Sequence, residues 1–222
     1  MLTLFHSPGS CSNGILYLLN EIGADHEVSV VNVLTGEQKT EAYLSLNPKG
    51  KVPALRLDSG EVVTEFQTIA FWLARSFPQA GLWPDDVLAQ ARTLEILDFI
   101  VGSVHMRGRT FIRMPHKFVD DAACQSVLQN HGRQQVRNGL AHLEATLGEQ
   151  PYMLGRFGLA DAAALYILDW AVRDEIELSS SLAAYRQRLR ARPAFAASAG
   201  SSVRIIRSRS PGEIFRSART RD

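Results

Sequence analysis

The stretch NPKGKVPALRLDSGEVVTE, residues 47–65, decides the fold of the first part of the chain. Its opening Asn-Pro-Lys-Gly predicts a turn, and residues 52–57 predict a strand with a proline near its start. The following Asp-Ser-Gly-Glu favours a hairpin, because glycine supplies the positive φ that tight connections need. Residues 62–64 predict a second strand, which leads into an apolar pattern at positions 69, 73 and 77. The stretch therefore predicts strand, strand, helix.

The residues before this stretch predict a strand, a helix and a second strand. Residues 2–5 are an apolar run that ends at Ser-Pro-Gly, and residues 26–33 alternate like a strand. Between them, apolar residues recur at positions 15, 18, 19 and 22, and Gly23 follows where a helix would end. Residues 1–80 thus predict one domain with the order β-α-β and then β-β-α, built on a mixed four-stranded sheet.

The second half of the chain carries only helical patterns. A linker is expected at 81–87, because Pro78 and Pro84 exclude regular structure there, and an all-helical bundle is expected at 88–200. Helices are predicted around 94–104, 136–147 and 182–192, the last halted by Pro193. Residues 160–173 are apolar nearly all round and predict the buried centre of the bundle. The arginine-rich residues 201–222 are expected to form a basic C-terminal extension.

Composition excludes several classes of partner. The chain has 222 residues, 45% hydrophobic and 21% charged, and its net charge of +1 gives no field that favours nucleic acid or an anionic membrane. Its most apolar stretch, 162–172, is interrupted by Asp169 and is too short to span a membrane. The N-terminus lacks a secretory signal, and two cysteines are too few for a disulfide framework. We expect a soluble, cytoplasmic protein, and the histidine spacing predicts no metal site.

Cys11 is the first candidate for chemistry. It follows the first strand and its turn at the start of the first helix, where backbone N–H groups and the helix dipole stabilise a thiolate. Position 14 is glycine, so a second cysteine for an internal dithiol cycle is absent from that turn. Disulfide chemistry at Cys11 would use an external thiol. The alternative is that Cys11 is a small buried apolar residue.

Two further features could bind a peptide-like ligand. A cis peptide at Val52-Pro53 would turn the Val52 N–H and C=O outward to pair with an added strand, whereas an edge-strand proline would have no such role. Glu65 and Phe66 stand at a strand-to-helix junction, where N–H groups can hold a carboxylate and Glu65 can pair with an ammonium group. Glu65 could equally be a partner of the helix dipole.

Together these features resemble the glutathione transferase family, and most closely its bacterial beta class. The matching residues are Leu4-Phe5 and Ser7-Pro8-Gly9-Ser10-Cys11-Ser12, then Asn47-Pro48-Lys49-Gly50-Lys51-Val52-Pro53-Ala54-Leu55, then Thr64-Glu65, and Phe157 to Ala162. The resemblance spans about residues 1–200. It implies a thioredoxin-like α/β domain that binds glutathione, an all-α domain that shapes the site of the second substrate, and a homodimer that acts in detoxification.

The resemblance also implies roles for individual residues. Cys11 faces the glutathione sulfur, with Ser10 or Ser12 as alternative contacts, and His105 approaches the sulfur from the helical domain. Glutathione is held by Lys51, Val52 and Pro53, and its γ-glutamyl end by Glu65 and the main chain of Phe66. Glutathione is then the co-substrate, without a metal, and the second substrate is a small electrophile or disulfide.

Departures from the family pattern leave alternatives open. Phe66 replaces a small or hydroxylated residue, so a side-chain contact to the γ-glutamyl carboxylate is lost. Gly158 replaces the Ser or Thr cap of a helix-capping box, which the fold should tolerate. The alternatives are a glutathione-dependent reductase, lyase or isomerase, a non-catalytic protein-binding member of the family, and a monothiol glutaredoxin with a helical appendix.

Overall fold

The computed structural model describes residues 1–199 and 204–206, and they group into two units. The first unit is Met1–Ala80 together with the described residues from Arg192 onward, and the second is Gly81–Ala191. None of the helices in these described residues combines the length and apolarity that a membrane crossing requires.

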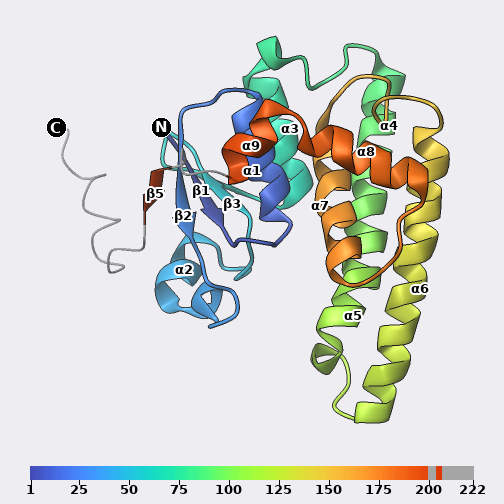
Figure 1. Ribbon diagram of the computed structural model, residues 1–222. Coiled ribbons are helices and arrows are strands. Elements are labelled where there is room, and N and C mark those ends of the chain that lie inside the picture. Colours follow the sequence, from blue (N-terminus) through green and yellow to red (C-terminus); the bar gives the residue numbers. More distant parts are fainter. Residues whose placement is uncertain (200–203, 207–222) are drawn as a thin grey trace. The chain divides into compact units, whose positions relative to one another are not determined.

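The first unit is built on a mixed sheet (Figure 1). Its strands are β1 (Leu2–His6), β2 (His26–Val30), β3 (Ala54–Arg56), β4 (Val62–Thr64) and β5 (Arg204–Ile206), in the order β4-β3-β1-β2-β5. β1 pairs with β2 in parallel, and β3 pairs with β1 and β4 antiparallel. The four predicted strands are confirmed. β5 is added beside β2, in parallel, from the segment expected to be a basic extension. The rest of that extension lies outside the described residues.

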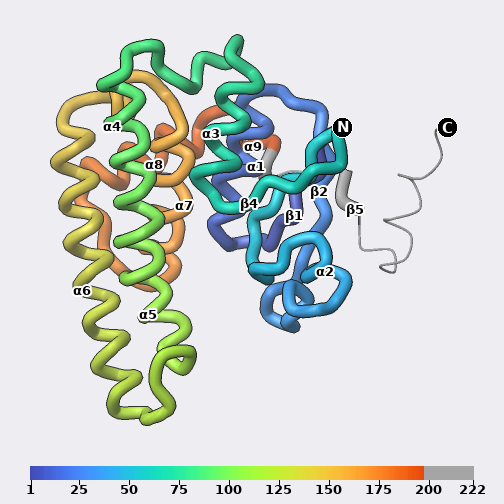
Figure 2. Tube along the Cα trace, turned by 180° about the vertical axis from the view of Figure 1, so that it is seen from behind, coloured from blue at the N-terminus to red at the C-terminus, as the bar shows by residue number. Residues whose placement is uncertain are grey.

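Alternation along the strands separates two packing faces. The helices of this unit are α1 (Ser12–Glu21), α2 (Glu41–Leu46), α3 (Phe66–Ser76) and α9 (Pro193–Ala199). α1, α3 and α9 lie together on one side, apart from α2 (Figures 1 and 2). Phe5 and Ala54 pack with Tyr43 of α2. α2 was not predicted, because its six residues are too few to show a helical period; Thr40 caps it by accepting the Tyr43 N–H.

The second unit is helical, as predicted. It contains α4 (Val87–Asp98), the π-helical segment η3 (Phe99–Arg109), α5 (Thr110–Arg113), α6 (Ala122–Leu147), α7 (Leu159–Arg173) and α8 (Ser180–Arg190). A short 3-10 turn lies at Pro115–Lys117 in this unit, and two others lie at Glu37–Lys39 and Pro78–Ala80 in the first unit. α6 ends at Leu147 and is followed by Gly148, which has a φ of 53°, and most of α7 is buried. α7 is therefore the buried helix that its apolar pattern predicts.

The helix predicted before Pro193 is confirmed as α8, and Pro193 itself begins a further helix, α9, that was not predicted. α8 ends at Arg190, and the fixed φ of a proline suits the first turn of α9. α9 packs on α1 through an edge-to-face contact of Tyr17 with Phe195, and Arg192 forms an ion pair with Glu21. The described residues from 192 onward thus lie with the first unit, although the sequence assigned residues up to 200 to the helical domain.

Asp161 links the start of α7 to the loop before it and to α8 through hydrogen bonds. Its carboxylate accepts hydrogen bonds from the N–H groups of Gly158 (2.8 Å) and Met153 (3.0 Å) and from the Tyr185 hydroxyl (2.5 Å). Burial raises the pKa of Asp161 to about 6, against the effect of these donors. The hydrogen bond from the Gly158 N–H to Asp161, which is one half of a capping box, is present although Gly158 has no hydroxyl, as expected from the sequence.

Candidate functional site

Cys11 and Val52 lie side by side in the first unit. Cys11 directly precedes α1 and is 9% exposed, and its Sγ lies 3.8 Å from the Val52 carbonyl oxygen. A thiol at that distance can donate a weak hydrogen bond to the carbonyl. Neither Cys11 nor Cys124 forms a disulfide among the described residues. The structure therefore joins the start of the first helix to the proline-containing segment, two features that the sequence singled out separately.

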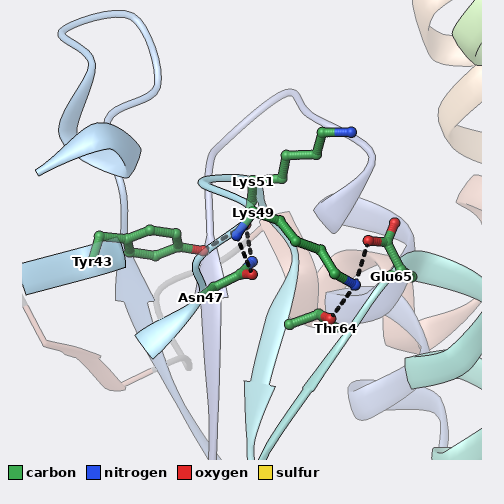
Figure 3. A network of polar contacts seen from close by, with 6 residues as sticks. All are labelled: Tyr43, Asn47, Lys49, Lys51, Thr64 and Glu65. Atoms are coloured by element: carbon green, nitrogen blue, oxygen red, sulfur yellow. Dashed lines mark hydrogen bonds and ion pairs between the residues drawn. The ribbon is translucent and has the colours of Figure 1, made fainter. Parts of the chain in front are cut away.

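The turn before Val52 is held by main-chain and side-chain contacts (Figure 3). The Lys51 carbonyl accepts hydrogen bonds from the Tyr43 hydroxyl (2.7 Å) and the Asn47 amide (2.8 Å). Gly50 has a φ of 58°, and a Cβ there would lie 3.0 Å from the Gln38 carbonyl oxygen. The Val52-Pro53 peptide bond is cis, which is one of the two alternatives that the sequence left open.

Ser12 supports the site from inside the core. Its hydroxyl is buried, accepts the Ser7 N–H (3.1 Å) and lies 2.7 Å from both Ser10 Oγ and His6 Nδ1. Burial lowers the pKa of His6 to about 4, so its ring is neutral at neutral pH and Nδ1 can accept the Ser12 proton. The Ser10 hydroxyl also accepts the Ser12 N–H (3.2 Å). Of the three consecutive residues 10–12, Cys11 is the one whose side chain points to Val52.

His6 makes stability depend on pH. Between pH 6.5 and 4 the unfolded chain binds a proton at His6 that the folded chain does not, so the free energy of unfolding falls as the pH is lowered through this range. The full difference is about 3 kcal/mol at pH 4. We expect the stability advantage of the wild type over His6→Asn, measured by urea unfolding, to shrink by about that amount from pH 7 to pH 4.

The comparison with His6→Asn is needed because Asp161 acts in the opposite direction. Its raised pKa of about 6 makes the folded chain bind a proton more readily, which stabilises it as the pH falls. This contribution is common to both proteins and cancels in their difference. A difference that stays constant with pH would mean that His6 titrates normally in the folded chain.

Glu65 occupies a strained position between β4 and α3. Its φ is 72° and its ψ 136°, outside the regions that side-chain-bearing residues ordinarily adopt. Its carboxylate is half exposed and accepts a hydrogen bond from Lys49 Nζ at 2.8 Å (Figure 3). The Phe66 ring is buried, so only its main chain can meet a ligand at the first turn of α3. The contact of Lys49 with Glu65 was not predicted from the sequence, although Lys49 stands within the quoted motif.

His105 lies on η3 in the second unit, next to two aromatic rings. Its ring centroid is 4.8 Å from that of Trp170 and 5.9 Å from that of Tyr166. The Arg109 guanidinium stacks 3.9 Å from the Trp170 ring, and its Nε donates to buried Asp174 (2.9 Å). An ion pair thus steadies the indole that contacts His105. The sequence missed this support, although Arg109 stands one helical turn after His105. The approach of His105 to the sulfur stays a prediction.

Metal ligation finds no support in the described residues. In 1–199 and 204–206, no three His, Cys, Asp or Glu side chains lie together in an arrangement that could hold a metal ion.

Comparison with known proteins gives matches over both units. The family models described as the N-terminal and C-terminal domains of glutathione S-transferase match residues 9–76 and 71–197. Glutathione S-transferase GstA of Escherichia coli O157:H7 is 30% identical over 199 residues, which cover 86% of this chain and 94% of the relative. A Sulfitobacter glutathione transferase homologue with bound glutathione has a TM-score of 0.84 at 26% identity, over 89% of this chain and 96% of its own. A beta class enzyme of Sphingomonas chungbukensis has a TM-score of 0.77 at 30% identity, over 88% and 96%.

Proposed function

The chain belongs to the glutathione transferase family, as its motifs predict, and we propose that its first unit binds glutathione with the sulfur beside Cys11. The protein is an enzyme that uses glutathione as co-substrate and activates its thiol. The observation that supports the proposed site is the 3.8 Å separation of Cys11 Sγ and the Val52 carbonyl oxygen. A sulfur, a strand-like main chain and a helix start meet there.

The cysteinyl and γ-glutamyl parts of glutathione have proposed partners in the first unit. The Val52 main chain pairs with the cysteinyl backbone as an added strand, next to Lys51 and Pro53. Glu65 receives the γ-glutamyl ammonium group, and the main chain of Phe66 at the start of α3 receives the carboxylate. The Phe66 side chain is buried inside the unit, which speaks against the non-catalytic alternative that Phe66 suggested.

The chemistry proposed is nucleophilic attack by the glutathione thiolate. The start of α1 and the donors around Cys11 stabilise the anion, and His105 is proposed to donate a hydrogen bond to it. The sulfur lone pair forms a bond to an electrophilic carbon, and the leaving group departs with the bonding electrons. With a disulfide as second substrate, the Cys11 thiolate attacks one sulfur and the other leaves as a thiolate; the glutathione thiolate then attacks the resulting mixed disulfide and releases the Cys11 thiolate. Ser12 and His6 position the residues that contact the ligand.

The thiol pKa of bound glutathione tests this proposal. We expect it to lie about two units below the roughly 8.5 of an ordinary thiol, because a few donors and the helix dipole stabilise the charge. Ultraviolet absorbance of the thiolate, followed against pH at saturating glutathione, measures it. A bound pKa equal to that in free solution would contradict the proposed activation.

The resemblance also supports proposals about the whole molecule. We propose a homodimer that acts in the cytoplasm and removes small electrophiles or disulfides, as the family pattern implies. Assay of a panel of electrophiles, ethers and disulfides would distinguish transfer to carbon from reductive or lyase chemistry.

A further inference from the structure

Lys49 makes contacts that place it at the γ-glutamyl end of the proposed site. Its Nζ donates to Glu65 Oε1 at 2.8 Å and to Thr64 Oγ1 at 2.9 Å (Figure 3). Both charged side chains are about half exposed, 51% for Lys49 and 49% for Glu65. The ammonium group therefore lies at the junction that leads into α3 and remains accessible to a ligand.

The turn directs Lys49 to this junction. The Asn47 side chain accepts the Lys49 N–H at 3.2 Å and donates to the Lys51 carbonyl. β3 pairs with β4 so that Ala54 lies opposite Thr64, which brings the end of β4 to the turn. Figure 3 shows the side chain of Lys49 reaching across to Thr64 and Glu65, while that of Lys51 extends away from them. The turn thus fixes the backbone of Lys49 beside this junction, and the side-chain conformation of Lys49 completes the contact.

Stability alone gives little reason for this ion pair. Exposed ion pairs contribute little to folding, because water screens the charges and two long side chains lose conformational freedom. Glu65 moreover stands at a strained φ, which is characteristic of functional sites. A carboxylate ligand brought next to Glu65 would be repelled unless a cation stood beside it. Lys49 is the cation that the structure places there.

We propose that Lys49 determines specificity for the γ-glutamyl group by binding its α-carboxylate while Glu65 binds its α-ammonium. This inference rests on the proposed glutathione site. Lys49 and Glu65 present one positive and one negative charge side by side, and the α-carbon of the γ-glutamyl group carries the matching pair. Lys49 supplies the side-chain donor that is lost where Phe66 replaces a hydroxylated residue. Charge-assisted hydrogen bonds are stronger than those between neutral groups, so the Lys49 ammonium group is a stronger donor to the carboxylate than the missing hydroxyl would be.

Calorimetric titration of the full chain with two ligands tests the proposal. The ligands are glutathione and an analogue in which 4-aminobutyryl replaces γ-glutamyl, which keeps the ammonium group and lacks the α-carboxylate. We expect Lys49→Gln to weaken glutathione binding about tenfold, or about 1.4 kcal/mol, and to leave binding of the analogue unchanged. Lys117→Gln removes the same charge from an exposed site in the second unit and should change neither affinity.

Other outcomes would overturn the proposal. Unchanged or tighter glutathione binding by Lys49→Gln would mean that Lys49 only neutralises Glu65 in the unliganded protein. An equal loss for both ligands would mean that it does not recognise the α-carboxylate. Failure of the wild type to bind glutathione would instead refute the proposed site itself. Circular dichroism of the variant separates misfolding from altered recognition, and Lys49→Arg, which keeps the charge, should retain most of the affinity if the variant is folded.

Discussion

Cys11→Ser is expected to reduce glutathione-dependent disulfide reduction by more than about a hundredfold. In the proposed cycle the Cys11 thiolate attacks a disulfide, forms a mixed disulfide and releases a thiolate; glutathione then attacks the mixed disulfide and regenerates Cys11. A serine hydroxyl cannot form the mixed disulfide, and loss of a covalent nucleophile leaves only residual activity. Initial rates with a small mixed disulfide of glutathione measure the effect.

Cys124→Ser is the matched control. Cys124 is exposed near the start of α6 in the second unit, so the same atom is exchanged far along the chain from the proposed site. Its rate should equal that of the wild type. Mass spectrometry of Cys124→Ser after exposure to glutathione disulfide should find one added glutathionyl group, and the double variant none. Unchanged exchange kinetics in Cys11→Ser would transfer the role to Ser10 or Ser12.

Sequence patterns predicted the elements that carry the proposed site because those patterns are local. The apolar run of β1, the helical spacing in α1 and the hairpin of β3 and β4 each extend over few residues and depend on turn chemistry. The proximity of Cys11 and Val52 depends on the antiparallel pairing of β1 with β3, which places Phe5 opposite Ala54. The family resemblance supplied that long-range step.

The directions of the side chains at the proposed site could not be predicted from the sequence. Ser10, Cys11 and Ser12 are consecutive, and successive residues at the start of a helix point about 100° apart, so they cannot all face a ligand. The structure turns Ser12 to His6 in the core and Cys11 to Val52. Lys49 meets Glu65 across sixteen positions of the chain, a contact that depends on one rotamer of a long side chain. Neither the directions of residues 10–12 nor the conformation of Lys49 produces a periodic pattern in the sequence.

The π-helical hydrogen bonding of η3 was equally unpredictable. Apolar spacing predicted one continuous helix, and the chain does run from α4 through η3 into α5 without a break. Periodicity reports which face is buried and not which carbonyl each N–H contacts. In the structure, glycines of η3 and α6 mark the places where these helices pack closely. A Cβ on Gly108 would lie 2.8 Å from Val136 Cγ2, and one on Gly139 would lie 2.5 Å from Val104 Cγ2.

Gly132→Ala is expected to destabilise the folded chain by about 2 kcal/mol. Its Cβ would lie 2.6 Å from the Gly108 carbonyl oxygen and 3.0 Å from Phe111 Cβ, so α6 would have to move away from η3 and α5. Overpacking of this kind costs up to about 3 kcal/mol, and the better helix propensity of alanine returns about 1 kcal/mol. The midpoint of urea unfolding, followed by circular dichroism, measures the change.

Gly102→Ala is the control, because a Cβ on that glycine of η3 meets nothing within 4 Å. Only the gain in helix propensity remains, so this variant should be stabilised by up to about 1 kcal/mol. The two substitutions are chemically identical and differ only in the space that the helices leave. Since η3 also carries His105, Gly132→Ala should lower activity even where the protein is folded, whereas Gly102→Ala should not. Equal stability of the two variants would mean that η3 and α6 pack less closely than the structure places them.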